Sequence, residues 1–198
     1  MTRIALLLIW LARLLPLRIL AAAGTVLGLA LYRLGRARRR VALTNLALCF
    51  PELSAEARMR IARAHFMALS RTILERGILW WSSAESVRRL VRVEGEEHWQ
   101  AVAHKPIIVL APHFIGFEMG GIRIHLDHPI ATMYSRQRDS VLDAMLLHGR
   151  TRFNAARVYS RQDGIRPIVK ALRAGMPLFY LPDMDFGNAF HVLRELGV

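Results

Sequence analysis

The sequence is poor in cysteine, lysine and acidic residues. Its single cysteine, Cys49, excludes an intramolecular disulfide framework. Lys105 and Lys170 are the only lysines among 28 basic residues, so the positive charge is almost entirely arginine. With 15 acidic residues, the formal net charge is +13 over 198 residues. So basic a chain favours acidic partners: nucleic acid, an anionic membrane surface or phosphorylated substrates. Cys49 itself lies in the apolar segment "LALCF", which predicts a buried, unreactive thiol.

The N-terminal region lacks an unbroken apolar run of the about 20 residues that a membrane-spanning helix needs. Two shorter apolar runs, residues 4–12 and 19–32, are separated by Arg13, Pro16 and Arg18. Three interpretations stay open: a cleaved signal peptide ending at "LAAAG", a helix lying in the membrane interface, and a tilted or imperfect span. The two arginines inside the apolar region argue against the signal peptide.

Arginines after the second apolar run predict the orientation of the chain. Arg33, Arg36 and Arg38 to Arg40 follow that run, whereas only Arg3 precedes both runs. This asymmetry places the remainder on the cytoplasmic side of a membrane and would attract anionic lipid headgroups. A nucleic-acid patch is the alternative, but the adjoining apolar segment favours a membrane. We therefore predict a membrane-associated segment over residues 1–40 and a second domain over residues 41–198.

The pattern of the second domain predicts an α/β fold. A helix is expected from an N-cap at Ser54 to a stop at Gly77, and "SSAE" at residues 82–85 predicts another helix start. Short β-prone runs then alternate with helical stretches, which indicates a mostly parallel sheet with helices on both faces. The expected strands are "LVRVEG", "PIIVLAP", "IATMYS", "ARVYS" and "MPLFYLP", and the expected helices lie near residues 96–103, 117–126, 139–149 and 163–174.

His113 is the first candidate catalytic residue, because it follows the apolar run "IIVLAP" at a predicted strand end. Ligands of open α/β sheets bind at the carboxyl ends of strands. A histidine there can take a proton from a hydroxyl, and a carboxylate at its other ring nitrogen, here assigned to Glu118, would fix the tautomer. No Gly-x-Ser-x-Gly motif is present, so we expect the nucleophile to come from the substrate.

For several other polar residues the sequence allows both a functional and a structural role. Asp183 and Asp185 in "LPDMDFG" could hold a divalent metal, but we favour a role in holding arginines and loops in place. "HLDH", residues 125–128, is interpreted as a surface polar turn rather than a metal pair. Arg150 and Arg152 either end a solvated helix or clamp a phosphorylated substrate.

These motifs resemble the lipid A (Kdo-dependent lauroyl and myristoyl) acyltransferases, within the lysophospholipid acyltransferase superfamily. The resemblance runs to about Gly187 through "NLALCFPELS", "APHFIGFEMGG", "GRTRF", "IRPIVKALRAG" and "YLPDMDFG". It implies a glycerol-3-phosphate acyltransferase-like fold at the cytoplasmic face of the inner membrane. It also implies transfer of an acyl chain from acyl carrier protein to a hydroxyl of a lipid A precursor, without a cofactor, metal or nucleic acid.

By the same resemblance, His113 is the general base, Glu118 orients it, Arg150 recognises phosphate or sugar acid, and Asp183 builds the site. Two departures stand out. Gly116 and Phe117 replace the family's usual Asn-Trp, and "NAFHVLRELGV" replaces an aromatic-rich continuation, so we expect a C-terminally truncated chain of poor activity or stability. The rivals are a metal-dependent, membrane-associated glycosyltransferase using Asp183 and Asp185, and an inactive fragment that only binds membrane.

Overall fold

The computed structural model describes residues 2–102, 105–154 and 156–183. The chain divides into two compact units: an N-terminal unit, Arg3–Ile78, and a C-terminal unit that begins at Leu79. The predicted limit at residue 40 lies within a helix, α3 (Arg36–Cys49), and the division into residues 1–40 and 41–198 stays a prediction.

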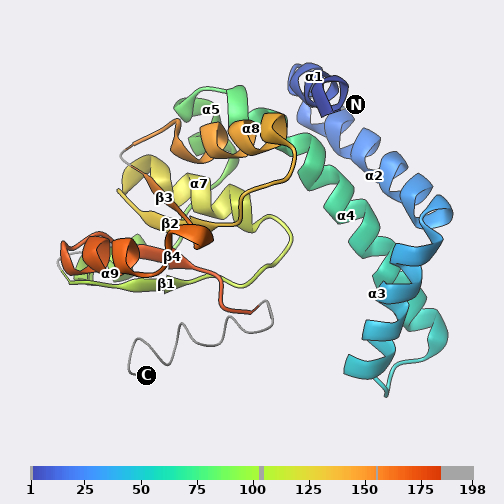
Figure 1. Ribbon diagram of the computed structural model, residues 1–198. Helices are drawn as coiled ribbons and strands as arrows, with labels where there is room; N and C mark the ends of the chain where they lie inside the picture. Colours follow the sequence, from blue (N-terminus) through green and yellow to red (C-terminus); the bar gives the residue numbers. More distant parts are fainter. Residues whose placement is uncertain (1, 103–104, 155, 184–198) are drawn as a thin grey trace. The chain divides into compact units, whose positions relative to one another are not determined.

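The N-terminal unit is built from α1 (Thr2–Ala12), α2 (Leu17–Leu34), α3 and most of α4 (Ala55–Trp81), seen in blue to green in Figure 1. Ser54 caps α4 as expected, since its Oγ accepts from the backbone N–H of Ala57 at 3.2 Å. The predicted stop at Gly77 is wrong, because α4 continues to Trp81. Gly77 instead admits α1: a Cβ there would lie 2.3 Å from the carbonyl oxygen of Ile9.

One stripe of α2 is buried, and two glycines let it approach α4 closely. Leu20, Gly24, Gly28 and Tyr32 recur every four residues and are the buried residues of α2. A Cβ on Gly24 would lie 2.7 Å from Cα of Arg71, and one on Gly28 would lie 2.4 Å from Cα of Met67. Among the described residues, α2 is also the one helix long and apolar enough to cross a membrane by length and composition.

The C-terminal unit continues with α5 (Ala84–Leu90) and α6 (Glu96–Val102), followed by a sheet with its connecting helices. The strands are β1 (Ile108–Leu110), β2 (Ala131–Tyr134), β3 (Arg157–Ser160) and β4 (Leu178–Tyr180). The connections are α7 (Phe117–Asp127), α8 (Ser140–Thr151), and the 3-10 turn η1 (Arg161–Asp163) with α9 (Arg166–Arg173). Within the described residues all strand pairs are parallel, in the order β1-β4-β2-β3.

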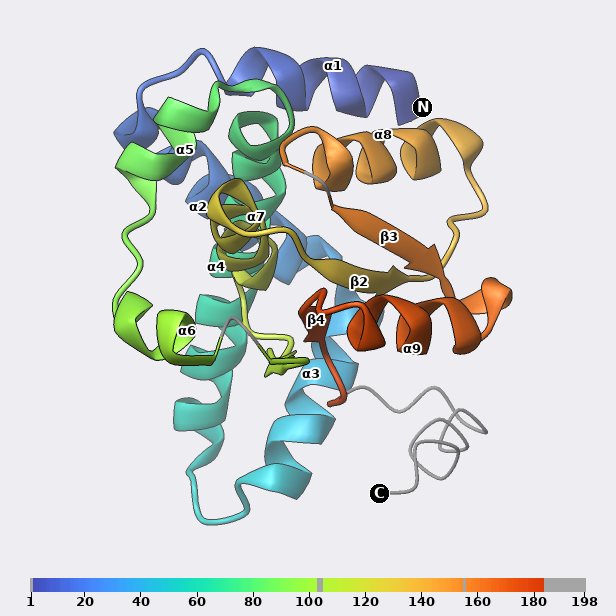
Figure 2. The same cartoon turned by 90° about the vertical axis from the view of Figure 1, so that its left-hand side faces the viewer.

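Helices cover both faces of this sheet, which confirms the predicted α/β architecture. Leu178 packs with Ile168 and Ala171 of α9 in the core, whereas the next residue, Phe179, faces α7, where a Cβ on Gly121 would lie 3.3 Å from its ring. Figure 2 shows α8 and α9 on opposite sides of the strands. Right-handed crossovers account for this, because the chain moves one way along the sheet through α7 and α8 and returns through α9.

Two predictions from the sequence are wrong: the first strand and the burial of Cys49. The segment "LVRVEG" forms no strand; it follows the end of α5, and the carbonyl of Val91 accepts from Nε of Arg123 at 3.0 Å. Cys49 is exposed rather than buried, because it is the last residue of α3. The four remaining strands and four predicted helices of the C-terminal unit are present within a few residues of their expected ranges.

Candidate functional site

The loops that leave β1 and β4 bring His113 and Asp183 together. The two strands are neighbours, with Leu110 in register with Tyr180, so their carboxyl ends meet at one sheet edge. The backbone N–H of Ala111 extends the pairing by donating to the carbonyl of Tyr180 at 2.9 Å. His113 and Asp183 each lie three residues beyond the last residue of their strand, and this symmetry places them side by side.

Both carboxylate oxygens of Asp183 accept hydrogen bonds from His113. Oδ1 lies 2.7 Å from the ring Nδ1, and Oδ2 lies 2.7 Å from the backbone nitrogen. The ring and backbone N–H groups of His113 hold the pKa of the Asp183 carboxyl below its usual value. An ionised carboxylate only accepts, so Nδ1 carries the proton and Nε2 carries the free lone pair. This is the tautomer that a general base at Nε2 requires.

Glu118 lies at the start of α7, beside Arg150 of α8. Gly116, with φ of 91°, ends the loop as the N-cap of α7, and Glu118 is in the first turn, where the helix dipole favours a carboxylate. Its side chain is only 9% exposed, and its Oε1 lies 3.8 Å from Nε of Arg150. The carboxylate at Nδ1 of His113, which the sequence assigned to Glu118, is therefore that of Asp183, and Glu118 forms an ion pair with Arg150.

The position of Arg150 depends on the glycine before it. Gly149 is buried against Trp80, which is itself only 1% exposed. A Cβ on Gly149 would lie 2.1 Å from Cδ1 of the Trp80 indole. Only glycine therefore allows α8 to lie this close to Trp80, and this approach sets where Arg150 meets Glu118.

We expect Gly149→Ala to destabilise the fold, because the added methyl overlaps a buried indole that has no room to move. Overpacking of this kind costs about 1–3 kcal/mol of unfolding free energy. Gly120→Ala on α7 is the matched control, since a Cβ there meets nothing within 4 Å. It should be neutral or stabilising by up to about 1 kcal/mol through helix propensity. Urea unfolding in detergent measures both; equal stability of the two variants would contradict the role of Gly149.

Arg152, for which the sequence left a solvated helix end and a substrate clamp open, is bound to backbone carbonyls. Its guanidinium donates to the carbonyl of Leu79 at 2.8 Å and to that of Ser82 at 2.5 Å, and it stacks on the ring of Phe153. Burial lowers the pKa of Arg152 from its usual value. The arginine thus ties the end of α8 to the last turn of α4 and the residue after it.

The "HLDH" segment is only in part the surface turn that the sequence predicts. His128 is partly buried; its Nε2 lies 2.9 Å from Oε1 of Glu96, and its ring stacks on Trp99. His125 is only 2% exposed, so the prediction of a surface residue is wrong there. In the part of the chain that the structure describes, no group of three or more histidine, cysteine or acidic residues could hold a metal ion. Asp185, the second aspartate of the metal alternative, lies outside the described residues.

The buried His125 predicts a loss of stability in mild acid. Burial lowers its pKa below the usual 6.5, an effect that backbone hydrogen bonds with His128 and Phe153 only partly offset. The unfolded chain therefore binds this proton more readily than the folded chain. Stability falls as pH drops below 6.5, at no more than about 1.4 kcal/mol per pH unit for one group.

The measurement is the urea midpoint of the full chain at pH 7.5 and 5.5, for the wild type and for His125→Gln. We expect the variant to lose less stability on acidification than the wild type. His98→Gln is the control, because the side chain of His98 is 88% exposed. If His98→Gln reduces the pH dependence as much as His125→Gln does, burial of His125 is not the cause.

Comparison with known proteins adds to this geometry. The family described as "Bacterial lipid A biosynthesis acyltransferase" matches residues 1–193. The chain is 30% identical over 182 residues to the lipid A biosynthesis palmitoleoyltransferase of Escherichia coli (strain K12), covering 91% of the chain and 59% of the relative. It is 28% identical over 190 residues to the lipid A biosynthesis lauroyltransferase of the same organism, covering 95% and 61%.

A lipid A biosynthesis acyltransferase of Haemophilus influenzae is 31% identical over 156 residues, covering 79% of the chain and 50% of the relative. The chain thus spans between 50% and 61% of the length of these curated relatives. The matched region contains His113, Glu118, Arg150 and Asp183. The chain belongs to the bacterial lipid A biosynthesis acyltransferase family.

Proposed function

We propose that this protein transfers a fatty acyl chain from the thioester of acyl carrier protein to a hydroxyl of a lipid A precursor, at the cytoplasmic face of the inner membrane. The observation that carries the proposal is the pair of bonds from His113 to Asp183, at 2.7 Å each, which directs the basic Nε2 away from the carboxylate. Family membership supports the reaction class and the kind of acceptor.

The chemistry requires one proton to move twice. Nε2 of His113 takes the proton of the acceptor hydroxyl as its oxygen attacks the thioester carbonyl, which forms a tetrahedral intermediate. The carbon–sulfur bond then breaks, and the departing thiolate takes the proton back from the imidazolium. The products are an ester and the free thiol of the carrier. Asp183 stabilises the imidazolium between the two steps and holds its ring orientation.

The surroundings of His113 suit a lipid substrate. Leu110, Phe114 and Ile115 are exposed apolar side chains on the strand and loop that carry the histidine. Exposed apolar groups so close together in the chain favour contact with hydrocarbon. We assign them to the acyl chain of either substrate.

Arg150 and Glu118 form the polar side of the proposed site. The side chain of Arg150 is 24% exposed, so it can reach an anionic acceptor while Glu118 keeps it in place. Its planar fork matches a phosphate or a sugar carboxylate. The net charge of +13 agrees with two acidic substrates, a carrier protein and a phosphorylated lipid.

The test compares two acceptors with the same labelled acyl carrier protein donor. One lipid A precursor carries hydroxyacyl chains, and the other carries the same chains without hydroxyl groups. We expect acylation of the first acceptor alone, because the nucleophile comes from the substrate. Equal labelling of both acceptors would contradict the proposal, and so would activity that disappears with a chelator and returns with a divalent metal.

A further inference from the structure

We propose that the N-terminal unit binds an anionic membrane with α2 lying in the plane of the lipid surface, and that α2 does not cross the bilayer. The hydropathy of α2 fits either arrangement. The contacts that α2 makes inside the N-terminal unit distinguish the in-plane arrangement from the spanning one. The inference goes beyond acyl transfer and does not depend on it.

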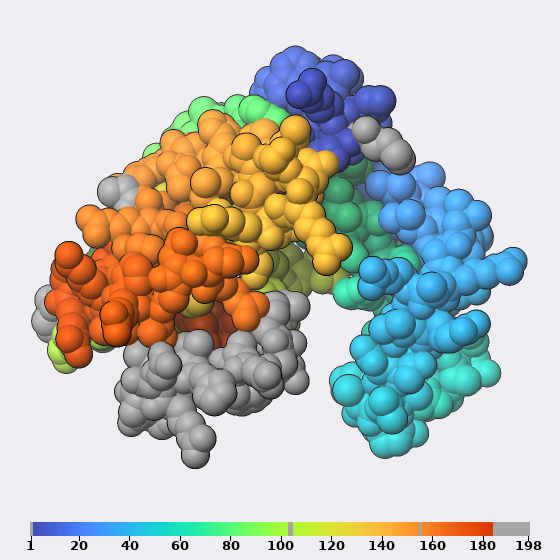
Figure 3. Space-filling view, in the orientation of Figure 1, coloured from blue at the N-terminus to red at the C-terminus, as the bar shows by residue number. Residues whose placement is uncertain are grey.

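The outer stripe of α2 is apolar and exposed. Around the rest of α2, opposite and beside the buried stripe of Leu20, Gly24, Gly28 and Tyr32, the exposed face is mostly apolar and includes Arg33 near its C-terminus. Its exposed apolar residues include Ile19, Ala22, Ala23, Val26, Leu27, Leu31 and Leu34. Figure 3 shows α2 and α3 as one continuous surface, in blue to cyan. An exposed apolar stripe of this kind favours contact with hydrocarbon. Lipid can provide that contact while α2 stays packed on α4.

The packing against α4 makes a spanning α2 unfavourable. Gly24 lies near the middle of α2, and it touches the backbone of Arg71. Gly28 touches Met67, and the ring of Tyr32 lies 5.6 Å from that of Phe66, so α4 runs antiparallel along α2. This stretch of α4 also carries Arg63, His65, Glu75 and Arg76.

If α2 crossed the bilayer, α4 would have to enter it as well. The exposed Arg71 would then lie at the depth of the bilayer centre, beside Gly24. A charged side chain at that depth is strongly disfavoured. At the lipid surface the same arginine reaches headgroups, so the in-plane arrangement removes the conflict.

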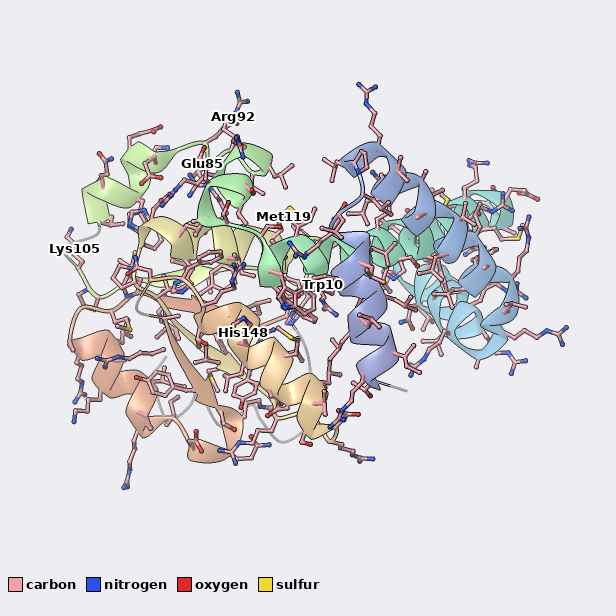
Figure 4. All side chains as sticks on the ribbon, turned by 90° about the horizontal axis from the view of Figure 1, so that it is seen from above. Trp10, Glu85, Arg92, Lys105, Met119 and His148 are labelled. Carbon is pink, nitrogen blue, oxygen red and sulfur yellow. The ribbon has the colours of Figure 1, made fainter. Side chains whose placement is uncertain are left out.

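The charge of the unit identifies the lipid. Residues 3–78 contain 13 arginines and three glutamates, with no lysine or aspartate. Arg36, Arg38 and Arg40 are exposed on α3, directly after α2. The exposed apolar residues of α1, among them Leu7, Leu8 and Trp10, add hydrocarbon contacts; the Trp10 side chain on α1 is labelled in Figure 4. An anionic bilayer is complementary to both features.

Cysteine labelling at the two ends of α2 tests the orientation. In the full chain with Cys49→Ser, Arg18→Cys and Arg33→Cys are made singly and probed with a membrane-impermeant maleimide. The reagent is added to sealed inner-membrane vesicles, right-side-out in one sample and inside-out in the other. We expect both cysteines to react in inside-out vesicles and neither to react in right-side-out ones. Reaction of the two ends from opposite sides, or of neither end in either preparation, would overturn the proposal.

Vesicle binding tests the partner. The wild type and the triple variant Arg36→Gln, Arg38→Gln, Arg40→Gln are mixed with vesicles that contain phosphatidylglycerol or only phosphatidylcholine. We expect the triple variant to bind anionic vesicles about 100-fold more weakly, and the difference to vanish on neutral ones. The matched control, Arg89→Gln, Arg157→Gln, Arg166→Gln, removes three exposed arginines of the C-terminal unit.

Equal weakening by the two triple variants would overturn the assignment to the N-terminal unit. A second copy of the chain is the competing occupant of the α2 stripe. Val26→Cys in the Cys49→Ser background distinguishes it, because a dimer through this stripe would form an interchain disulfide without vesicles. We expect the cysteine to stay reduced and to become protected from the maleimide when anionic vesicles are added; a disulfide would overturn lipid as the partner.

Discussion

His113→Ala should lower acyl transfer by at least about 100-fold, the usual contribution of a positioned general base. The variant keeps the sheet edge and the apolar residues near it. It lacks the imidazole whose Nε2 would accept the hydroxyl proton. The effect should appear in kcat rather than in KM, because the base acts on the transition state. The measurement is the initial rate of transfer from labelled acyl carrier protein.

His98→Ala is the matched control for this substitution. The side chain of His98 is 88% exposed and belongs to α6, outside the loops that follow β1 and β4. We expect His98→Ala to retain the wild-type rate within about threefold. If His113→Ala lowers the rate by less than threefold, His113 is not the general base.

Asp183→Asn should produce the second large loss, of about 10²–10⁴-fold in kcat, because it disturbs the tautomer of His113 without changing the size of the side chain. An amide can donate to Nδ1, which would move the ring proton to Nε2 and block the base. Nitrogen-15 NMR of labelled histidine measures that shift directly, and a merely structural aspartate would not cause it. Glu97→Gln, an exposed carboxylate on α6, is the control.

The ionisation of Asp183 adds a pH signature to this prediction. Its folded pKa lies below the usual value of 3.8, because the ring N–H and then the backbone N–H of His113 donate to it. The contribution of this contact to stability is therefore complete above about pH 4 and is lost as pH falls through the folded pKa. Asp183→Asn should remove that acid-dependent part; an unchanged acid profile would show that the contact contributes nothing to stability.

The sequence placed His113 at a strand end, and the resemblance named Asp183 as part of the site, but neither identified Asp183 as the partner of Nδ1. An apolar run followed by a histidine is a local pattern, and β1 ends where that pattern indicates. Asp183 is 70 residues away along the chain. Its contact with His113 depends on β4 pairing directly with β1, a strand order that periodicity does not reveal. Glu118 was assigned because it is near His113 in sequence, although the start of α7 directs it towards Arg150.

Glycines account for other differences between pattern and structure. Gly77 is an ordinary stop signal in a single sequence, but in the fold it is the point where α1 meets α4. Gly24 and Gly28 read as parts of an apolar run, yet they decide which stripe of α2 is buried. Gly149 gives no local signal at all, since its requirement comes from Trp80, far away in sequence. Close approaches of this kind depend on tertiary packing.

The most direct test of the proposed function is a mass balance on acyl transfer, with the 198-residue chain as the candidate enzyme. Acyl carrier protein loaded with one acyl chain is incubated with the lipid A precursor, and mass spectrometry quantifies the acylated lipid and the free carrier thiol. We predict one acylated lipid for each thiol released, in the wild type and not in His113→Ala. Thiol release without acylated lipid, or equal product from both proteins, would contradict acyl transfer by a base held at the ends of β1 and β4.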